Sequence, residues 1–567
     1  MKLRGYIILF LFAVNLPAIL KAQNTILTDP QFEMALINLG IDTGQVDGFV
    51  PTNQISSIKI LNVSNKNISS LNGIQDFIAL EELDCGNNKI TTLDLSGNVK
   101  LQKLYCYSNA ISTINISQNN LLTALALGNN KISQLSVNHL IHLKNLNCHY
   151  NQLTVLNLSA NDSLTNLTCQ NNQITSLNLS NTPFLYGVYC NDNKLTLLQL
   201  PQKSQMGYLH CQNNLLTYLD LKNNTLIWRL ECNDNLLDSI SLSNDSSLVE
   251  LRCENNKLRS LDISSNLALK KLYCYKNKLA LINTKKNGLL TEFHCSYNLL
   301  SKIEIDNNLL LEELYCSFNT LQALNISLNK NLLVLSSTNC NLNSIDISKN
   351  IKLRSISVSN NNLTEFNPTL NPELWNIECM NNQLLVLDVL SNPKLLDLRC
   401  RNNLLEGLDI RKNEILRELD CSYNKLKCLN VANGSNVARY LTINIRYNPY
   451  LYCVTVDNLE YANMRWIYSK DDQTEFSLSC DNVCLTSIGE PIKNISIAVF
   501  PNPCMDILSI EGNISIELIE VYNSTGKKMT VDMIDESHID VSKLATGFYI
   551  IRGIYKDKFF VAKFSKI

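Results

Sequence analysis

The sequence predicts an all-β-dominated protein, in which a solenoid of two parallel sheets is followed by a small C-terminal antiparallel β-sandwich. Cysteine recurs at a fixed interval of 21 residues through most of the chain. Short apolar triplets with a period of two alternate with polar turns, a pattern typical of strands rather than helices. The last stretch, residues 494–567, consists of β-rich runs that turn signals separate.

The N-terminus has the features of a secretory signal peptide, which we place at residues 1–22. Lys2 and Arg4 precede the apolar run 7–14, and Ala22 supplies a small residue at a plausible cleavage point. An uncleaved anchor helix is the alternative, but the apolar run falls well short of the ~20 residues that a membrane span needs.

Residues 23–60 are expected to form a helical cap on the N-terminal edge of the solenoid. Thr28 or Asp29 suits the N-cap position and Pro30 the first helical position. The expected apolar face and stop signal are Phe32, Leu36, Leu39 and Gly40.

A column of cysteines defines the repeat. Steps of 21 from Cys85 reach cysteine at fourteen of seventeen positions without a slip in register. The column is Cys85, Cys106, Leu127, Cys148, Cys169, Cys190, Cys211, Cys232, Cys253, Cys274, Cys295, Cys316, Ser337, Val358, Cys379, Cys400 and Cys421. Asparagine stands three residues after each of these, from Asn88 to Asn424, except at Cys340.

The second half of each repeat follows the same pattern. An apolar triplet such as Leu93–Leu95 ends ten residues after the cysteine, and asparagine recurs three residues later, as at Asn98. One such coil cannot bury its apolar face alone, so we expect the coils to stack into a continuous core. An upstream copy, residues 61–71, is expected to open the stack with Val63 in the column.

The column cysteines are interpreted as small buried hydrophobic residues. Leu127, Val358 and Ser337 replace them within the chain itself, and none of these can form a disulfide or bind a metal as a thiolate does. Disulfides along the column are an alternative, but stacked coils lie ~4.8 Å apart, wider than the ~3.8 Å Cβ separation of a disulfide. A metal array is a further alternative that lacks any close pair of ligands.

These residues resemble the leucine-rich repeats of bacteria, specifically the 21-residue class with two half-repeats, over residues 61–436. The resemblance implies a solenoid in which asparagine side chains form ladders with the turn backbone. Residues 437–484 resemble the cap that follows such repeats in secreted proteins. In this segment Cys453 and Cys480 are expected to form a disulfide, whereas Cys428, Cys484 and Cys504 are left unassigned.

After a linker at residues 485–493, residues 494–567 resemble the type A C-terminal sorting domain of the type IX secretion system of Bacteroidetes. The matching motif residues are Pro501, Asn502, Pro503, Asp506, Gly526, Leu544, Gly547 and Tyr549. The resemblance implies the type IX secretion machinery as a partner and an extracellular destination, either released or attached to the outer-membrane surface. An ordinary binding sandwich is the alternative.

We find no motif of a catalytic, metal or cofactor site, and we expect neither enzyme activity nor a cofactor. The net charge of −2 does not favour nucleic acid as a partner, and no later stretch is apolar enough to span a membrane. The outward residues of the second triplet run Asp94, Asn115, Ser136, Asn157, Asn178, Gln199 and Asp220. A solvated face is expected there, with a calcium array as the alternative.

The outward residues near the column cysteine are rich in aromatic rings, which suit protein hot spots and sugar stacking. The candidate binding residues are Tyr105, Tyr107, Tyr150, Tyr189, His210, Tyr273, Tyr275, His294, Tyr297, Tyr315 and Phe318; His149 and Tyr423 share this face. We therefore expect a non-enzymatic recognition protein for an extracellular protein or polysaccharide. A structural or adhesive surface element without a specific ligand, whose tyrosines merely stack between coils, is the alternative.

Overall fold

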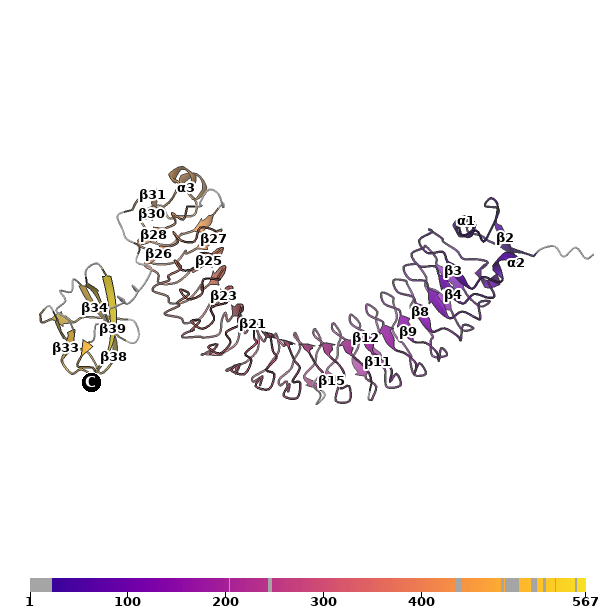
Figure 1. Ribbon diagram of the computed structural model, residues 1–567, viewed down its shortest axis with the longest axis horizontal. Helices are drawn as coiled ribbons and strands as arrows, with labels where there is room; N and C mark the ends of the chain where they lie inside the picture. Colours follow the sequence, from indigo (N-terminus) through magenta and orange to yellow (C-terminus); the bar gives the residue numbers. More distant parts are fainter. Residues whose placement is uncertain are drawn as a thin grey trace, which may run out of the picture. The chain divides into compact units, whose positions relative to one another are not determined.

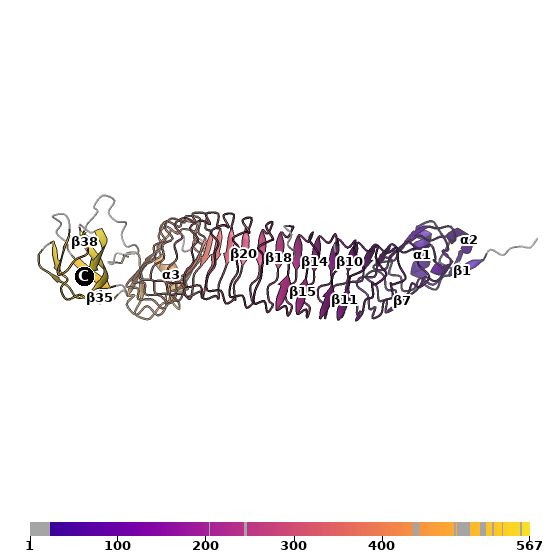
Figure 2. The same cartoon turned by 90° about the horizontal axis from the view of Figure 1, so that it is seen from below.

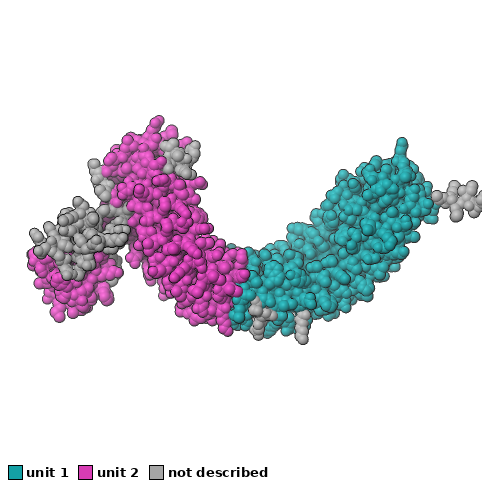
Figure 3. All heavy atoms as spheres, viewed as in Figure 1, with its two compact units in different colours: residues 1–269, 276–278 teal, residues 270–275, 279–567 magenta. Residues whose placement is uncertain are grey.

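The computed structural model describes residues 23–202, 204–242, 247–434, 441–480, 484, 499–510, 518–523, 527–535, 537–555 and 558–567. The expected signal peptide, residues 1–22, and the expected linker, residues 485–493, lie outside the described residues. The chain divides into unit 1, Met1–Leu269 with Lys276–Lys278, and unit 2, Lys270–Tyr275 with Leu279–Ile567 (Figure 3).

Unit 1 is a stack of coils with one continuous parallel sheet on what we call the first side, the side of the column cysteines. Its strands are β3 (Ile60–Asn62), β4 (Glu82–Asp84), β6 (Lys103–Tyr105), β8 (Ala124–Ala126), β9 (Asn145–Asn147), β10 (Asn166–Thr168), β12 (Gly187–Tyr189), β14 (Tyr208–His210), β16 (Arg229–Glu231) and β18 (Glu250–Arg252). Leu83 pairs with Leu104 and Leu104 with Leu125, so equivalent residues of successive coils are neighbours. The fixed interval of the sequence thus becomes the register of the sheet.

The second side of unit 1 is less regular. Its paired strands are β5 (Thr92–Asp94) with β7 (Thr113–Asn115), β11 (Ser176–Asn178) with β13 (Leu197–Gln199), and β15 (Tyr218–Asp220) with β17 (Ser239–Ser241). Figure 2 shows β10 and β14 on one side of these coils and β11 and β15 on the other. The sequence predicts two sheets, and the second is built from separate pairs. Exposed backbone tolerates this interruption because water satisfies its polar groups.

The first side of unit 2 has the same architecture. Its strands are β19 (Lys271–Tyr273), β20 (Glu292–His294), β21 (Glu313–Tyr315), β22 (Val334–Ser336), β23 (Ser355–Ser357), β24 (Asn376–Glu378), β25 (Asp397–Arg399), β27 (Glu418–Asp420) and β29 (Thr442–Asn444). The last strand shows that the stack continues past residue 436. Ile445 takes the column position 24 residues after Cys421, so an insertion conceals this coil from a strict 21-residue ruler.

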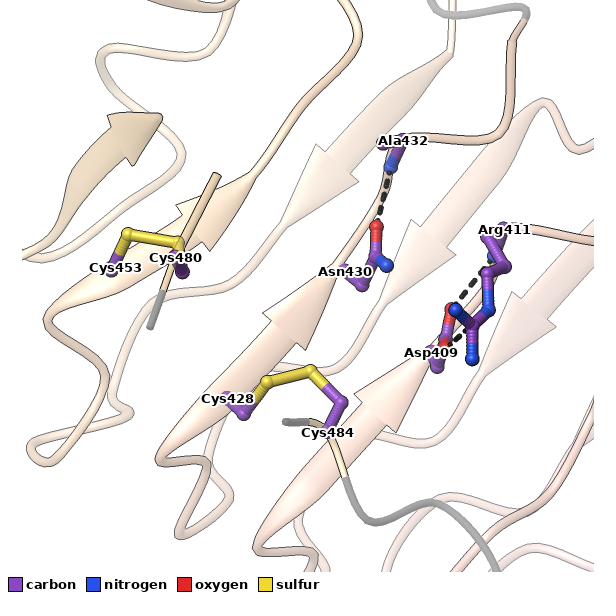
Figure 4. Close-up of a disulfide and its surroundings, with 8 residues drawn as sticks. All are labelled: Asp409, Arg411, Cys428, Asn430, Ala432, Cys453, Cys480 and Cys484. Atoms are coloured by element: carbon purple, nitrogen blue, oxygen red, sulfur yellow. Dashed lines mark hydrogen bonds and ion pairs between the residues drawn. A yellow bond between two sulfur atoms is a disulfide. The ribbon is translucent and has the colours of Figure 1, made fainter. Parts of the chain in front are cut away.

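On the second side of unit 2, regular pairing is confined to the end of the stack. The strands β26 (Gly407–Asp409), β28 (Cys428–Asn430), β30 (Cys453–Thr455) and β31 (Glu475–Ser477) form one parallel sheet. Disulfides join Cys453 to Cys480 and Cys428 to Cys484, and both anchor to strands of this sheet (Figure 4). The cap is completed by α3 (Leu459–Arg465) and by Trp466, whose buried indole donates to the carbonyl of Leu441 at 2.9 Å.

The N-terminal edge is covered by α1 (Pro30–Asn38), the hairpin of β1 (Asn24–Ile26) and β2 (Phe49–Pro51), α2 (Thr52–Ile55) and the 3-10 turn Ile74–Asp76 (Figure 1). Asp29 is the N-cap of α1, and its second oxygen accepts from Ser70 N at 2.9 Å, which ties the helix to the first coil. Phe32 and Leu36 are buried as predicted, but Leu39 is exposed, because α1 ends one residue before it.

The column side chains are buried inside the coils. All fourteen column cysteines are free thiols, as the substitutions within the column predict. Burial raises the pKa of the Cys148 thiol to about 12, so such a thiol remains protonated at physiological pH. The column therefore contributes buried packing to the core of the stack.

Two ladders of asparagine connect the coils. On the first side, Asn172 donates to the carbonyls of Cys148 at 3.0 Å and Cys169 at 3.1 Å, and it accepts from Leu153 N at 2.9 Å. At the one exception, the Cys340 thiol reaches the carbonyl of Cys316 at 3.2 Å, the contact that an amide would make. On the second side, Asn161 donates to the carbonyls of Val137 and Leu140, but its side-chain oxygen has no hydrogen-bond partner among the described residues.

The C-terminal region folds into two antiparallel sheets around its own core. One contains β32 (Val499–Phe500), β33 (Ile507–Ile510), β36 (Asp532–Met533) and β37 (His538–Asp540). The other contains β34 (Leu518–Asn523), β35 (Lys528–Met529), β38 (Gly547–Tyr555) and β39 (Lys558–Lys566). Their core buries Cys504, Leu544 and Tyr549. The two sheets agree with the expected small sandwich.

The two ladders predict different energetic costs for the same substitution. Asn172→Leu leaves the buried Leu153 N–H without an acceptor. It also removes one of the two hydrogen bonds that each of the Cys148 and Cys169 carbonyls accepts, so we expect it to lower the free energy of unfolding by about 3 kcal/mol. Asn161→Leu removes two donated bonds but also an unpaired acceptor, so we expect a loss of about 1 kcal/mol. Urea denaturation of the two variants measures the difference, and equal losses would show that the accepted bond contributes nothing.

Candidate functional site

The candidate site lies on the outward surface of the first side, where each coil leaves its strand and turns. The second residue after the column position has a left-handed backbone, from Asn87 at φ 53° to Tyr423 at φ 56°. Asparagine and aspartate occupy most of these positions, as expected, because they tolerate this conformation better than other non-glycine residues. Large side chains at the same position are therefore residue types that the fold does not favour.

The largest side chains at this left-handed position are aromatic. Tyr150, Tyr297 and Phe318 have φ values of 49°, 55° and 57°, and their exposed fractions are 54%, 48% and 38%. A bulky residue with such a backbone costs free energy, and such costs are tolerated most often at functional sites. Since exposed rings gain little from burial, these positions are candidates for binding.

In unit 2 the predicted residues form two ring stacks on adjacent coils. His294 lies between Tyr273 and Tyr315, with ring centroids 4.7 Å and 4.3 Å away. Tyr297 and Phe318 are stacked at 4.2 Å with an interplanar angle of 9°. Tyr273 is only 7% exposed and its hydroxyl donates to Glu292, so it supports the face from within rather than offering a contact surface.

In unit 1 a second aromatic cluster forms around Tyr189 and His210, whose rings lie 4.6 Å apart. Tyr208 contacts both of these rings as well as Tyr186 and Trp228. Tyr208 was not predicted, because the predicted rings all lie within two residues of the column position and Tyr208 lies three residues before Cys211. Strand alternation, which makes Tyr208 and His210 the two outward residues of β14, is the signal that could have identified it.

Two more predicted residues, Tyr105 and Tyr275, also lie on the first side. Tyr105 on β6 is half-buried, and its ring does not contact another aromatic ring among the described residues. Tyr275 is half-buried beside the Cys274 column position. Tyr423 lies outside the candidate list but stacks on Tyr447 at 4.1 Å, with the Arg401 guanidinium 4.7 Å from its ring.

A hollow opens on the first side of unit 1 above the coil of β8. It encloses about 460 Å³. Its lining residues come from three adjacent coils: Tyr107, Ser108, Ala126, Gly128, Asn129, Asn147, His149 and Tyr150. Tyr107 and Tyr150 were predicted as binding residues, and the hollow places them together with His149.

Charged residues form a network further along unit 1. Glu231 accepts from His210 at 3.0 Å and from Arg229 at 2.7 Å. The hydrogen bond from His210, reinforced by Arg229 and opposed by burial, lowers the pKa of Glu231 to about 2. The neighbouring Glu254 is buried and its Oε2 has no hydrogen-bond partner among the described residues. Burial raises the pKa of Glu254 to about 7.

Unit 2 places three groups of metal-ligating type together. Ligand atoms of Glu292, His294 and Glu313 lie within 4.8 Å of one another. The 21-residue register, which pairs Glu292 with Glu313, is the signal that could have identified this group in the sequence. The ammonium group of Lys271, 2.7 Å from Glu292, already neutralises one of the carboxylates.

The outward residues of the second side have a structural role. Asp94 Oδ1 accepts from Ser96 N at 3.0 Å, and Asn157 and Asp220 accept in the same way from Ser159 and Lys222. The hydrogen bond from the Ser96 backbone lowers the pKa of Asp94. These contacts are turn caps, which account for the residue types without a bound ion.

The sorting-motif residues hold the end of the C-terminal sandwich. Asn502 donates to the carbonyl of Lys563 at 3.0 Å and accepts from Ser565 N at 2.9 Å. The hydroxyl of Tyr549 donates to the carbonyl of Ala545 at 2.7 Å. The remaining motif positions are Pro501 and Pro503 flanking Asn502, exposed Asp506, buried Leu544 and Gly547 at the start of β38; Gly526 lies outside the described residues.

Comparisons with known proteins agree with both parts of the chain. Residues 498–566 match the secretion system C-terminal sorting domain family, which confirms the sorting domain. No curated protein matches the chain. No helix among the described residues has the length and apolar character required to cross a membrane.

Three solved structures are similar to the chain. YopM from Yersinia enterocolitica has 23% identity and a TM-score of 0.57, covering 74% of this chain and 91% of its own. The plant peptide hormone receptor RGFR1 has 18% identity and a TM-score of 0.58, covering 76% and 81%. The functional domain of InlJ from Listeria monocytogenes has 21% identity and a TM-score of 0.49, covering 96% and 99%. The likenesses to YopM and RGFR1 establish the fold, a parallel β-solenoid like that of leucine-rich-repeat proteins.

The raised pKa of Glu254 predicts a pH-dependent stability. Because its folded pKa of about 7 exceeds the ordinary 4.5, the contribution of Glu254 to stability is complete below about 4.5 and is lost as the pH rises towards 7. Glu254→Gln is therefore expected to raise the free energy of unfolding at pH 8 by about 2 kcal/mol and to change little at pH 4. Denaturant unfolding at the two pH values measures this.

Glu231→Gln is the matched control, because it should have the opposite effect. Its folded pKa of about 2 lies below the ordinary value, so its stabilising contribution is present at neutral pH and is lost on acidification. If both variants destabilised the protein at pH 8, burial would not be the dominant influence on Glu254.

Proposed function

We propose that this protein is an exported, non-enzymatic recognition protein that binds a protein or glycan outside the cell through the first side of its solenoid. The observation that carries the proposal is the set of exposed aromatic rings at left-handed turn positions, where most coils have asparagine or aspartate. The stack does not require these rings, and the backbone makes them costly. A surface selected for solubility alone would lack them.

The sorting domain supports an extracellular location. A C-terminal domain of this family marks the chain for the secretion machinery, and the expected signal peptide would deliver it to the periplasm first. The two disulfides of the cap agree with an oxidising compartment. Release and attachment to the outer-membrane surface are both compatible with this route.

The fold supports recognition rather than catalysis. The similar receptor RGFR1 is described in complex with RGF2, and a long outward sheet surface suits a ligand that extends over several coils. A structural or adhesive element without a specific ligand is the second candidate. The ring stacks that join adjacent coils, such as Tyr297 with Phe318, favour it, because they also fit a role in cohesion.

Export is tested by deletion of residues 494–567. We expect the truncated protein to accumulate in the periplasm with its repeats folded, because the solenoid and its cap have their own core and disulfides. Cell fractionation of the native host measures the location, and resistance of the repeats to proteolysis is the control for folding. Unchanged delivery to the surface would contradict the sorting role.

Recognition is tested by the double substitution Tyr297→Asn and Phe318→Asn. Asparagine is the residue that most coils have at this left-handed position, so we expect unchanged or slightly increased thermal stability. Capture of envelope and culture-medium components by the immobilised protein should fall by about tenfold or more if the rings are binding anchors.

Tyr218→Asn is the matched control, because Tyr218 is a similarly exposed ring, 47% accessible, on the second side of unit 1. It should leave capture unchanged. If the double variant lost stability while its capture remained intact, the rings would serve cohesion and the second candidate function would be correct.

A further inference from the structure

The hollow above β8 is a built feature of unit 1, and its construction begins with small residues. The outward residues of this coil that line the hollow are Ala126 and Gly128. The preceding coil places Tyr105 and Tyr107 at the equivalent positions. One coil with very small outward side chains therefore lies between two coils that carry aromatic rings. A depression one coil wide results.

Two glycines permit the rings to adopt their positions. A Cβ atom on Gly86 would lie 2.6 Å from the Tyr107 ring, and one on Gly128 would lie 2.2 Å from the His149 ring. Any other residue at these positions would displace the rings. Thus Tyr107 leans over Gly86, His149 leans over Gly128, and the space above Ala126 stays open.

The lining combines aromatic faces with neutral polar groups. Ser108, Asn129 and Asn147 contribute a hydroxyl and two amides. Asn129 donates to Ser108 at 3.2 Å, and Asn147 Oδ1 contacts the His149 ring nitrogen. The hydroxyls of Tyr107 and Tyr150 and the Asn147 amide nitrogen make no hydrogen bond within the described part of the chain, so they are available to a ligand.

Among the described residues, none that lines the hollow carries a formal charge. Its one titratable base is His149, and burial lowers the pKa of this imidazole below its ordinary value of 6.5, so the ring is neutral at physiological pH. An acidic or basic ligand would therefore lose hydration without gaining an opposite charge. A metal ion would find a single imidazole and no carboxylate.

We propose that this hollow binds a neutral saccharide unit, with its apolar ring face against Tyr107, His149 or Tyr150 and its hydroxyls hydrogen-bonded to Asn129, Asn147 and Ser108. The proposal rests on the proposed recognition function and specifies one ligand class for unit 1. Sugar hydroxyls both donate and accept, which matches amide and hydroxyl partners. The volume of about 460 Å³ falls within the ~300–1,000 Å³ typical of small-molecule sites.

The test uses the full mature protein on an array of immobilised neutral and acidic oligosaccharides. We expect binding to one or more neutral glycans that is insensitive to added salt, because no ion pair contributes. Ala126→Tyr should reduce this binding by about tenfold or more, since a ring would fill the hollow. Tyrosine occupies the equivalent position at Tyr105 and Tyr189, so the variant is expected to fold.

Ala124→Tyr is the matched control, because it makes the same change two residues away on the same strand and outside the hollow. It should leave glycan binding unchanged. Binding of acidic glycans only, no glycan binding, or equal binding by the wild-type protein and Ala126→Tyr would each overturn the proposal. The capture assay with substitutions at Tyr297 and Phe318 concerns unit 2, so a failure of the saccharide site is distinguishable from a failure of recognition in general.

Discussion

The structure depends on one interaction, the hydrogen bonding of a buried asparagine amide to the backbone of two successive coils. Asn172 donates to the carbonyls of Cys148 and Cys169 and accepts from the Leu153 N–H, which the tight turn would otherwise leave buried without a partner. Since these bonds recur along the column, with the Cys340 thiol as the one substitute for asparagine, the interval between asparagines cannot vary without breaking them. The 21-residue repeat of the sequence is the consequence, and the column residue beside the turn is buried.

The two sides of the coil differ in how completely the amides are used. On the first side the amide oxygen accepts a hydrogen bond from a backbone N–H, as in Asn172. On the second side the side-chain oxygens of Asn161, Asn329 and Asn371 have no hydrogen-bond partner in the part of the chain that the structure describes. The first side also carries the continuous sheet of each unit, whereas the second carries separate strand pairs in unit 1 and one four-stranded sheet at the end of the stack in unit 2. A better-satisfied side is a more rigid platform, and binding groups are positioned best on rigid elements. The concentration of exposed rings on the first side agrees with that difference.

Much of the fold was accessible from the sequence, because a repeat exposes its constraints many times. The helix at Asp29, the cysteine column and the sorting motif were each identified from residues alone. The interruption of the second sheet could not be predicted, because the sequence pattern of the LxL triplets is the same whether or not adjacent coils form hydrogen bonds there. The coil at Ile445 was missed because an insertion displaces it from the 21-residue register. The hollow was not predicted either, because it arises from the small residues Ala126 and Gly128, whereas the binding site was predicted from the positions of aromatic rings.

The hollow over Ala126 and Gly128 illustrates which residues can determine ligand specificity in a repeat protein. Inward positions are fixed by packing and turn positions by hydrogen bonding, so a ligand can be distinguished only through outward residues, and these vary independently from coil to coil. A coil with large outward residues provides contact area, whereas a coil with small outward residues leaves a depression whose shape can match a ligand. In unit 1 the coil that breaks the cysteine column, with Leu127, is also the coil whose outward residues are smallest. Leucine is larger than cysteine and apolar, so the core beneath the hollow remains filled while the surface above it is open.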